Sequence, residues 1–535
     1  MTKNLSALCL ILLLVNFSTL AQDTARVSPF SKSTTYKYIN PIVPGFYPDP
    51  SIVKVNDDFF LVTSSFEYFP GIPIFHSKDL VNWRQIGHVI TKASQAFLDS
   101  AKHSHGIFAP NISYHNGKFY VAVFNRTSGK NLIYSASNPA GEWSEPITVK
   151  QSGGDPALYF ENNKAYFVTA SDVILCSEID ILTGEILKAP QKLWSGTGGR
   201  FPEGPHLYKI NGYYYLMIAE GGTEYGHMET IARSKTMWGP YESFQGNPIL
   251  THRNKGTHPI QGVGHADLFC DSQSNWWVVC LAYRQVASFQ QFHHLGREVF
   301  LAPVSWKNDW PVVNNNEGLS FEMVTNRKMA NQNLIANTID NFDSTQLAFY
   351  WNTLRKPIDN YYSLNLRKGW LSLTGQAQTL DAIGSPTFIG RRLQHFNTTC
   401  TTEIDFSPAK NGEESGLVVY KKDEHHYEIA ITQLNDKRYL IVRKTIGSLS
   451  AIVVKEVIPE GNVQLKVTTE PLWIHFSYSL NNQSFKYLAK GETRYLSTEV
   501  AKSYTGLYIG LYATGNGQQC TKPAFFNYFN YQINH

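Results

Sequence analysis

Three acidic residues stand at matching places in the sequence: Asp49, Asp155 and Glu203 each open a short apolar strand that is followed by a turn. Carboxylates held close together raise one another's pKa and destabilise a fold, so such clusters occur mainly where acid–base chemistry needs them. An aspartate before proline often only caps a turn, which is the structural explanation for each acid taken alone. Three acids in equivalent positions favour a shared catalytic role instead.

These acids belong to an internal repeat that predicts how they are positioned. Each of five segments has a small or polar opening residue, a short apolar strand, a turn rich in Asn, Asp or Gly, and a second, aromatic-rich strand. The segments open, 46 to 62 residues apart, at Asp49, Ala109, Asp155, Glu203 and His265. Repeats of this length in a β-rich chain predict a five-bladed β-propeller, whose first strands line a central axis. We therefore expect the five opening residues to meet at one end of that axis.

A different β-rich region follows the repeat, which ends after residues 310–313. Residues 331–337 form a polar connector, and alternating strands without the repeat's plan return from about residue 341, as at 416–420, 427–431 and 507–512. Short strands over roughly 190 residues predict a β-sandwich or jelly roll. The chain is therefore predicted to be all-β, with a propeller over residues 36–325 and a sandwich over residues 340–535.

Composition narrows the class of partner. Charged residues make up 17% of the chain and aromatic residues 13%, and the formal net charge is only +4, with no run of Lys or Arg. A nucleic acid or an anionic membrane surface attracts a dense basic patch, so both are excluded as main partners. Many aromatic side chains with few charges suit a neutral ligand on an aromatic-lined surface.

The N-terminus predicts export. Lys3 precedes an apolar run from Ala7 to Val15, and the small residues Thr19 and Ala21 follow, as at the cleavage site of a signal peptide over residues 1–21. The run is too short to span a bilayer, and no other segment approaches the roughly 20 apolar residues that a membrane helix needs. The mature protein is therefore expected in the periplasm or outside the cell, without membrane attachment.

Five cysteines follow the predicted signal: Cys176, Cys270, Cys280, Cys400 and Cys520. An odd number at irregular spacing predicts neither a disulfide framework nor a CxxC metal site. Cys270 and Cys280 flank one predicted turn, which leaves a disulfide between them and two free thiols as the alternatives.

Several spaced motifs carry a resemblance to a known family. They are Phe46–Ser51 (FYPDPS), Gly154–Ala157 (GDPA) and Pro202–Pro205 (PEGP), and they resemble the signatures of glycoside hydrolase family 43. Two further segments, SFEYFPG at 65–71 and GRE at 296–298 with Trp310-Pro311, narrow the resemblance to two-domain β-xylosidase/α-L-arabinofuranosidase-like members. The resemblance extends from about Tyr38 to the C-terminus. It implies a concanavalin-like sandwich as the second domain.

The resemblance implies a role for each acid. Asp49 matches the general base that activates water, Glu203 the general acid that protonates the departing oxygen, and Asp155 the carboxylate that tunes and orients the acid. An inverting hydrolase needs one ionised and one protonated carboxyl group on opposite faces of the sugar, roughly 6.5–9.5 Å apart with water between them. A further negative charge beside an acid keeps that acid protonated at working pH.

Other positions are implied as binding residues. Arg297 matches an arginine that hydrogen-bonds sugar hydroxyls, and His265 matches an axial histidine that family members place against a metal or beneath the sugar. No metal or cofactor is expected to be required, with a structural calcium near His265 as the alternative. Phe66 and Phe108 are expected to wall the sugar pocket, and Tyr504 to reach it from the sandwich. Core packing is the alternative for each aromatic, and Phe108 replaces the Trp of many relatives.

The function implied is that of an exo-acting, inverting β-1,4-xylosidase that releases xylose from xylo-oligosaccharides or xylan. An α-L-arabinofuranosidase or a bifunctional enzyme is the nearest alternative, because both sugars present similar hydroxyl groups to one pocket. A non-catalytic carbohydrate-binding protein is a third alternative, which the presence of all three acids disfavours. The sandwich is expected to close the pocket, or alternatively to bind polysaccharide by itself. The sequence leaves the oligomeric state open.

Overall fold

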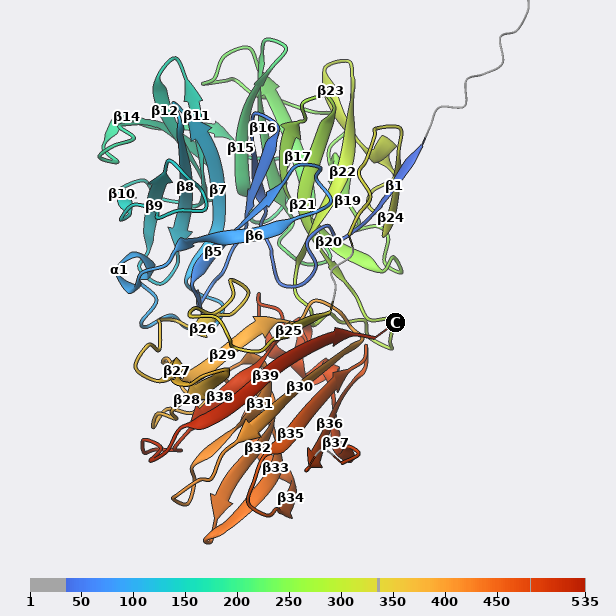
Figure 1. Ribbon diagram of the computed structural model, residues 1–535. Helices are drawn as coiled ribbons and strands as arrows, with labels where there is room; N and C mark the ends of the chain where they lie inside the picture. The colour runs from blue at the N-terminus through green and yellow to red at the C-terminus, as the bar shows by residue number, and fades with distance from the viewer. Residues whose placement is uncertain (1–34, 334–336, 482, 535) are drawn as a thin grey trace, which may run out of the picture.

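The computed structural model describes residues 35–333, 337–481 and 483–534, and the signal peptide predicted over residues 1–21 lies outside them. Apart from strands, the described residues form only α1 (Ala93–Ala96), α2 (Thr498–Ala501) and the 3-10 helices η1 (Asn314–Asn316) and η2 (Thr493–Leu496). Two β-units lie one above the other (Figure 1). The prediction of an all-β chain is confirmed.

Five antiparallel sheets follow one another along the first unit. The first sheet contains β2 (Ser51–Val55), β3 (Asp58–Val62), β5 (Gly71–Ser77) and β6 (Arg84–Ile90), and the second contains β7 (Ile107–His115), β8 (Lys118–Asn125), β9 (Lys130–Ala136) and β10 (Ile147–Val149). The third contains β11 (Gly154–Glu161), β12 (Lys164–Ala170), β13 (Ile174–Ile179) and β14 (Ile186–Trp194), and the fourth contains β15 (Glu203–Ile210), β16 (Tyr213–Glu220), β17 (Met228–Ser234), β18 (Glu242–Ser243) and β19 (Leu250–Thr251). The fifth contains β20 (Ile260–Cys270), β21 (Trp276–Arg284), β22 (Glu298–Lys307) and β23 (Trp310–Val313). Asn116-Gly117 and Asn211-Gly212 take positive φ angles, which close the tight hairpins that their sequences predict.

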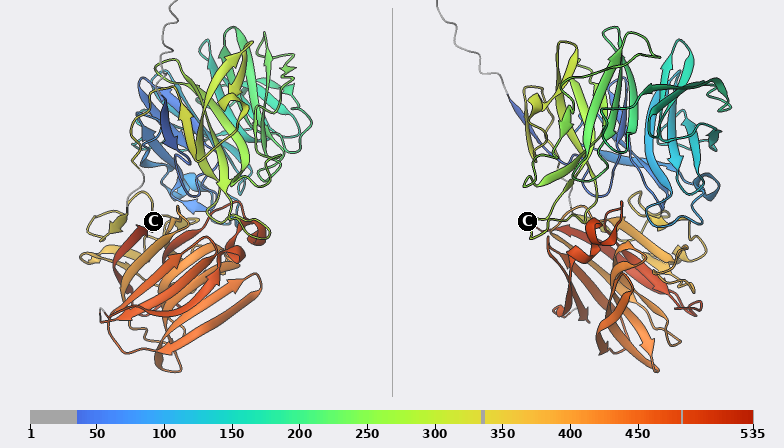
Figure 2. Two further views of the ribbon diagram at one scale, coloured as in Figure 1. Left: turned by 90° about the vertical axis from the view of Figure 1, so that its right-hand side faces the viewer. Right: turned by 180° about the vertical axis from the view of Figure 1, so that it is seen from behind.

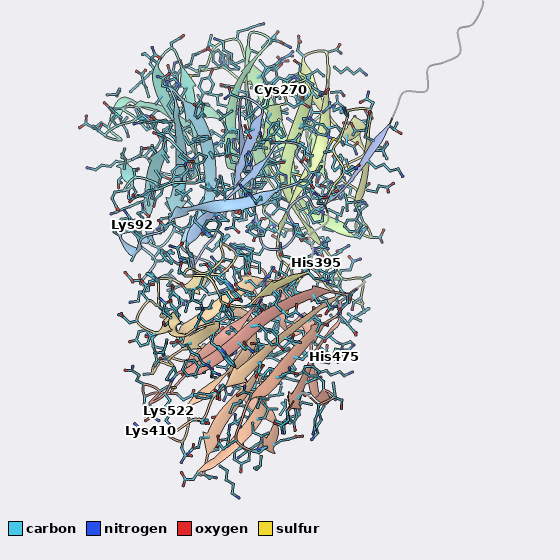
Figure 3. All side chains as sticks on the ribbon, in the orientation of Figure 1. Lys92, Cys270, His395, Lys410, His475 and Lys522 are labelled. Atoms are coloured by element: carbon cyan, nitrogen blue, oxygen red, sulfur yellow. The ribbon has the colours of Figure 1, made fainter. Side chains whose placement is uncertain are left out.

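The first strands of the five sheets form a closed ring. β2 contacts β7 and β20, β11 contacts β7 and β15, and β15 also contacts β20. The fifth of these strands, β20, ends at Cys270, which Figure 3 labels at the end of the unit farther from the second unit. The residues that open β20 therefore lie toward the second unit.

One buried carboxylate fixes three of these first strands to one another. Asp267, on β20, accepts hydrogen bonds at Oδ2 from the Ser51 hydroxyl (2.8 Å) and the Ile52 amide (2.9 Å) of β2. Its Oδ1 accepts a hydrogen bond from the Tyr208 hydroxyl (2.8 Å) of β15. Hydrogen bonds to an ionised group are stronger than neutral ones, so the axis is a rigid support for the residues at its end.

The two chain segments that bound the first unit are paired with each other. β1 (Tyr36–Ile39) runs antiparallel to β24 (Glu322–Thr325), and Lys37 forms an ion pair with Glu322 (2.6 Å). The buried Tyr38 side chain donates a hydrogen bond to the Leu301 carbonyl oxygen (2.9 Å) on β22. The start of the described chain is thus fastened to the fifth sheet, which closes the unit.

The second unit is a sandwich of two antiparallel sheets with a shared aliphatic and aromatic core. The larger sheet contains β25 (Thr338–Asp340), β27 (Tyr362–Arg367), β28 (Trp370–Leu373), β30 (Thr398–Asp405), β35 (Val463–Thr469), β36 (Trp473–Leu480), β37 (Lys486–Glu492) and β39 (Ala524–Ile533). The smaller sheet contains β29 (Thr387–Arg392), β31 (Glu414–Lys422), β32 (His425–Leu434), β33 (Lys437–Ile446), β34 (Leu449–Val457) and β38 (Tyr508–Thr514). The predicted β-sandwich is therefore present.

The sandwich packs against one end of the first unit, as both views in Figure 2 show. β4 (Tyr68–Phe69) of the first unit pairs with β26 (Thr353–Leu354) of the second, so the backbone itself bridges the junction. Tyr68 stacks on Tyr508 with ring centroids 3.9 Å apart, and Arg392 donates a hydrogen bond to the Phe46 carbonyl oxygen (2.6 Å). The covered end is the one that carries the opening residues of the ring.

The thiols take no part in holding the fold together. All five cysteines in the described ranges are free, so of the two alternatives for Cys270 and Cys280 the structure has free thiols. Cys270, on β20, pairs across the sheet with Trp276, whereas Cys280, on β21, pairs with Phe300 of the next strand, β22. Among the described residues, no helix is long and apolar enough to cross a membrane.

Candidate active site

The predicted site residues gather at the end of the ring that faces the sandwich. Asp49 lies two residues before β2, Asp155 is the second residue of β11, and Glu203 begins β15. His265 lies in the middle of β20, and Arg297 directly precedes β22. Two ion pairs, Arg297–Asp49 and His265–Asp155, together with the charge of Glu203 acting on His265 and Asp155, join these side chains into one cluster.

Irregular backbone conformations set the direction of three of these side chains. Asp49, Asp155 and His265 have φ angles of 56°, 46° and 50°, in the left-handed region that residues other than glycine seldom adopt. The pairing register shifts around Asp155 in β11 and around His265 in β20. Such bulges turn a side chain away from the regular alternation of a strand, and they are common next to active sites. Here the left-handed conformations, and the bulges at Asp155 and His265, hold three polar groups at the end of the ring that faces the sandwich.

Asp49 is a buried, ionised carboxylate. Its Oδ1 accepts a hydrogen bond from Arg297 Nη1 (2.9 Å), and its Oδ2 accepts a short one from the Ser64 hydroxyl. Burial alone would raise the pKa of Asp49, but the charges of Arg297 and His265 and the Ser64 hydrogen bond outweigh it and lower the pKa below its ordinary value. The group is therefore held in the form that can accept a proton.

Arg297 connects this carboxylate to the walls of the site. Its Nη1 also donates to the Thr223 hydroxyl (2.9 Å), and its Nη2 donates to the Tyr504 carbonyl oxygen (3.4 Å) of the sandwich. The guanidinium lies 5.8 Å from the centroid of the Phe66 ring and 5.9 Å from that of Tyr504. The buried Nε has no protein partner, which leaves a donor available at the bottom of the site.

Asp155 and His265 form an ion pair, and the pKa of each group is raised. His265 Nε2 lies 3.5 Å from Asp155 Oδ2. Burial raises the pKa of Asp155, and the charges of Glu203 and Asp49 raise it further, against the opposing effect of His265. Burial lowers the pKa of His265, but Asp155, Asp49 and Glu203 outweigh it and bring that pKa to about 10. His265 is therefore an imidazolium at neutral pH.

Glu203 is the most accessible of the three acids. Its side chain is 27% exposed, against 15% for Asp155 and 7% for Asp49. Oε1 of Glu203 lies 3.3 Å from Nε2 of the fully buried His227, whose Nδ1 lies 3.0 Å from the Gly262 carbonyl oxygen. A carbonyl oxygen only accepts, so Nδ1 carries a proton and the imidazole ring is fixed in orientation. The ring in turn lies against one oxygen of the Glu203 carboxyl group.

Asp155 also holds the backbone beside the acid. Its Oδ2 accepts a hydrogen bond from the amide of Gly204 (3.2 Å), the residue that follows Glu203. Gly204 has φ = 57°, and a Cβ on it would lie 2.8 Å from the His265 ring. Glycine is therefore required at this place, both for its backbone conformation and for the close approach of the imidazolium.

Aromatic rings line one side of the cluster. Phe66 lies 5.3 Å from Phe108 and 5.7 Å from Phe46, measured between ring centroids. Tyr504 stacks toward Phe66 at 6.3 Å with an interplanar angle of 30°, and its side chain is 52% exposed. The structure thus brings Phe66, Phe108 and Tyr504 together beside Arg297, as a wall to which both units contribute.

The loop that carries Tyr504 is anchored at several points. The amide of Tyr504 donates a hydrogen bond to the Ser104 hydroxyl (2.9 Å), and Lys421 donates a short hydrogen bond to the Thr505 carbonyl oxygen. A Cβ on Gly506 would lie 2.2 Å from the Leu295 carbonyl oxygen. Only glycine permits this approach of the sandwich loop to the first unit.

Sequence reasoning did not single out Ser64, Thr223 or His227. Each lies in a loop that follows the second strand of its sheet: Ser64 follows β3, while Thr223 and His227 lie between β16 and β17. In an up-and-down sheet these loops return to the end at which the first strand starts. Polar residues just after the second strand of each repeat are therefore the signal that could have identified them.

The donor set does not fit a metal ion in the part of the chain that the structure describes. No group of three or more His, Cys, Asp or Glu side chains there is placed to hold one. His265, the residue suggested for a calcium site, is an imidazolium paired with Asp155, and a protonated ring nitrogen has no lone pair to offer. Calcium moreover prefers several oxygen ligands.

Two family models match the chain, one for each unit. Residues 38–311 match the model described as "Glycosyl hydrolases family 43". Residues 339–532 match the model described as "Beta xylosidase C-terminal Concanavalin A-like domain". Together they cover both the ring with its cluster and the sandwich that packs on it.

Curated relatives and solved structures agree with these matches. The chain is 41% identical to a non-reducing end α-L-arabinofuranosidase of Bacteroides ovatus, over 99% of both chains, and 35% identical to a xylosidase/arabinosidase of Butyrivibrio fibrisolvens, over 92% of this chain and 98% of the other. A solved family 43 protein from the xyloglucan locus of Bacteroides ovatus superposes with a TM-score of 0.90 at 40% identity, covering 93% of this chain and all of that one. A xylan β-1,4-xylosidase from Bacillus halodurans superposes with a TM-score of 0.87 at 31% identity, covering 92% and 99%. The chain therefore belongs to glycoside hydrolase family 43, as a glycosidase built from a propeller and a concanavalin-like sandwich.

Proposed function

We propose that this enzyme is an inverting, exo-acting β-1,4-xylosidase in which Asp49 is the general base, Glu203 the general acid and Asp155 the residue that tunes and orients the acid. The observation that carries the proposal is the contrast between the carboxyl groups. Arg297 and Ser64 hold Asp49 ionised, as a base must be, whereas Glu203 is the most exposed of the three acids and lies 3.3 Å from the His227 imidazole. A buried ionised carboxylate and a more accessible carboxyl group suit the division between base and acid that inversion requires.

The five sheets of the first unit support the count of five blades. Their first strands close one ring, and the repeats that open at Asp49, Ala109, Asp155, Glu203 and His265 contribute one sheet each. In this arrangement the base and the acid come from blades on different sides of the axis. That separation leaves room between them for a sugar and a water molecule, as inversion requires.

The reaction then follows from the contacts of each group. Asp49 removes a proton from a water molecule, which attacks the anomeric carbon from the side opposite the departing oxygen. Glu203 donates its proton to that oxygen, with one oxygen of its carboxyl group lying against the His227 ring. Asp155 fixes the following amide, and Arg297 and His265 donate hydrogen bonds to the hydroxyl groups of the sugar. We propose that no metal ion is required for any of these steps.

Closure by the sandwich supports action at chain ends. Tyr504 comes from the second unit and lies beside Phe66 and Arg297 of the first. A pocket whose wall is completed by a second domain admits one terminal sugar rather than the middle of a polymer. This use of the sandwich is favoured over an independent polysaccharide-binding role, because its loop contributes directly to the wall.

An α-L-arabinofuranosidase, or an enzyme with both activities, is the second candidate. It is favoured by the 41% identity, over 99% of both chains, to a relative with that name, and by a second relative named for both activities. Xylosidase remains the main proposal because relatives from Bacillus subtilis and Bacillus halodurans, 31% identical over nearly their whole length, are named β-xylosidases. The substrate is in either case a hemicellulose oligosaccharide. Export through the predicted signal peptide, to the periplasm or beyond the cell, would bring the enzyme to it.

A paired assay tests the proposal. Initial rates of the purified mature protein are compared on an aryl β-D-xyloside and an aryl α-L-arabinofuranoside, and proton NMR follows the anomer that is released first. Faster xyloside cleavage with release of the inverted anomer supports the main proposal. Faster arabinofuranoside cleavage reassigns the enzyme to debranching, and release of the retained anomer removes Asp49 as a base. Cleavage of neither substrate would favour the non-catalytic carbohydrate-binding protein.

A further inference from the structure

An exposed aromatic ring stands two residues before Glu203. Phe201 lies in the loop that joins β14 to β15, and its side chain is 63% exposed. Its backbone has φ = 53°, a conformation that a bulky residue adopts only when its surroundings impose it. An aromatic side chain that is both exposed and held in a costly backbone conformation calls for an explanation.

A buried carboxylate clamps the loop that presents this ring. Glu220, the last residue of β16, is fully buried and accepts hydrogen bonds from the amides of Thr197 (3.0 Å) and Gly199 (2.8 Å) and from the Thr230 hydroxyl (2.6 Å). A Cβ on Gly196 would lie 2.6 Å from Glu220 Oε1. The loop before Phe201 is therefore packed directly against an ionisable group that is removed from water, which makes the loop rigid.

A second set of contacts fixes the residue beside the ring. Arg200 Nε donates to the Gly221 carbonyl oxygen (2.8 Å), and the Gly221 amide donates to the Arg200 carbonyl oxygen (2.7 Å). The Arg200 guanidinium forms a close ion pair with Glu224 and lies 5.4 Å from the centroid of the Phe201 ring. The loop is thus joined on one side to the segment that follows β16, and the ring is backed by a cation.

These contacts place Phe201 at the rim of the site, on the side of the acid. A Cβ on Gly222 would lie 3.3 Å from the Phe201 ring, and the next residue, Thr223, is hydrogen-bonded to Arg297. The Phe201 ring therefore lies between Glu203, which is two residues along the chain, and the loop of Gly222 and Thr223, whose Thr223 hydroxyl is hydrogen-bonded to Arg297. In a glycoside hydrolase the acid faces the departing oxygen, so the leaving sugar lies on the acid's side of the bound terminal sugar.

We propose that Phe201 is a stacking surface for the first sugar of the leaving group, and that it selects a pyranose in this position. The flat face of a pyranose with equatorial hydroxyl groups presents C–H bonds, which pack on an aromatic ring. Because the ring is fixed before the substrate arrives, little side-chain entropy is lost on binding. The inference rests on the proposed function, since it takes Glu203 as the acid.

The test separates leaving groups with and without a sugar. Phe201→Ala and wild type are compared on a disaccharide, xylobiose, and on β-D-xylosyl fluoride, whose leaving group is a single atom. If the paired assay shows a preference for arabinose, an arabinosyl-xylobiose replaces the disaccharide and arabinofuranosyl fluoride replaces the xylosyl fluoride. We expect kcat/KM on the disaccharide to fall about tenfold, as for the loss of one well-packed aromatic contact. Activity on the fluoride should stay within about twofold of wild type, because no contact with a leaving sugar is involved.

Two further variants keep the test decisive. Phe201→Tyr preserves the stacking face and should retain the activity on the disaccharide. Tyr487→Ala removes an aromatic of similar exposure (55%) on β37, in the sandwich, and should change neither activity. Thermal unfolding shows whether Phe201→Ala remains folded.

Two results would overturn the inference. An equal loss of kcat/KM on the disaccharide and on the fluoride would assign Phe201 a purely structural role. Full activity of Phe201→Ala on the disaccharide would show that the leaving sugar does not contact the Phe201 ring. The proposed function fails separately if wild type cleaves neither substrate, and the stacking role, which depends on it, then falls with it.

Discussion

At the scale of single residues, the site is a set of charges whose environments differ although they lie close together. Asp49 has a guanidinium and a hydroxyl as partners, Asp155 has an imidazolium, and Glu203 has one face toward solvent and one toward His227. Each left-handed backbone conformation at Asp49 and Asp155 costs on the order of 1 kcal/mol. The fold tolerates these costs because the ring of first strands, joined by the hydrogen bonds of Asp267, is a rigid support for the cluster.

The Arg297–Asp49 contact predicts a pH effect. Arg297 stabilises the carboxylate form and so lowers the pKa of Asp49; in Arg297→Met that pKa rises. The base must be ionised to work, so the acidic limb of the kcat/KM profile should move to higher pH. A pH–rate profile on an aryl glycoside measures it, with Arg233→Met, an arginine far from the cluster, as the control. An unmoved acidic limb would show that Asp49 is not the group titrating there.

Replacing the acid predicts a dependence on the leaving group. Glu203→Gln removes the donated proton but keeps the side chain's size, so the rate on xylobiose should fall by about 10²–10⁴-fold. An aryl glycoside with a nitrophenolate leaving group needs less assistance and should lose much less. Steady-state kinetics on both substrates give the comparison. Equal losses would argue for a role other than proton donation.

The three acids could be found from sequence because they occupy equivalent positions of a repeat, and a repeat of this length predicts that such positions meet at one end of a central axis. Ser64, Thr223 and His227 could not be found in the same way. Their place after the second strand of a repeat puts them at the same end of the ring, but their roles depend on where loops from different sheets meet, which no local pattern predicts. Phe201 is hidden for a similar reason, since only its exposure and its unusual backbone distinguish it from a core aromatic.

At the scale of elements, the short hairpins of the first unit are local, and their turn residues predict them well. The sandwich pairs strands that are far apart in the chain: β28 and β30 both pair with β39. Alternating apolar residues predict that these strands exist, but not which strands they pair with, because the partners are chosen by the assembled core. The sandwich could therefore be predicted as a class, whereas its strand order could not.

The loop between α2 and β38 is the element that brings Tyr504 to the site, and Gly506 allows it to dock. In Gly506→Val the side chain would meet Leu295 and Phe46, so the loop should be displaced. We expect kcat/KM on oligosaccharides to fall by at least about tenfold, as for the loss of a positioned wall. Gly256→Val, at a glycine with open space around it and no positive φ, serves as the comparison. Kinetics together with crystal structures of the two variants would settle whether displacement accompanies the loss.

At the scale of the whole molecule, the two units form one active site. The first unit supplies the acids, Arg297 and the aromatic residues Phe66 and Phe108, and the sandwich supplies Tyr504; the pairing of β4 with β26 joins the two units. Substrate access is therefore set by the junction between the units, not by either unit alone. This is the physical basis for expecting action at chain ends.

Product analysis tests that expectation. With xylohexaose as substrate, the single pentose should appear from the first time point, followed by each oligosaccharide shortened by one unit. Chromatography of an early time course, below about one tenth conversion, gives the pattern, since binding of one terminal sugar allows only stepwise shortening. Early xylobiose and xylotriose in quantities equal to xylose would instead indicate a cleft open at both ends.

The place of β39 in the sheet has a consequence for how the protein is made. This strand, Ala524–Ile533, lies between β28 and β30 inside the larger sheet of the sandwich. A ribosome delivers it after every other strand of that sheet, so until then two sheet edges face an empty slot and offer unpaired backbone groups. Every nascent chain thus passes through a stage in which it can capture a strand from another molecule, and a short C-terminal deletion would make that stage permanent.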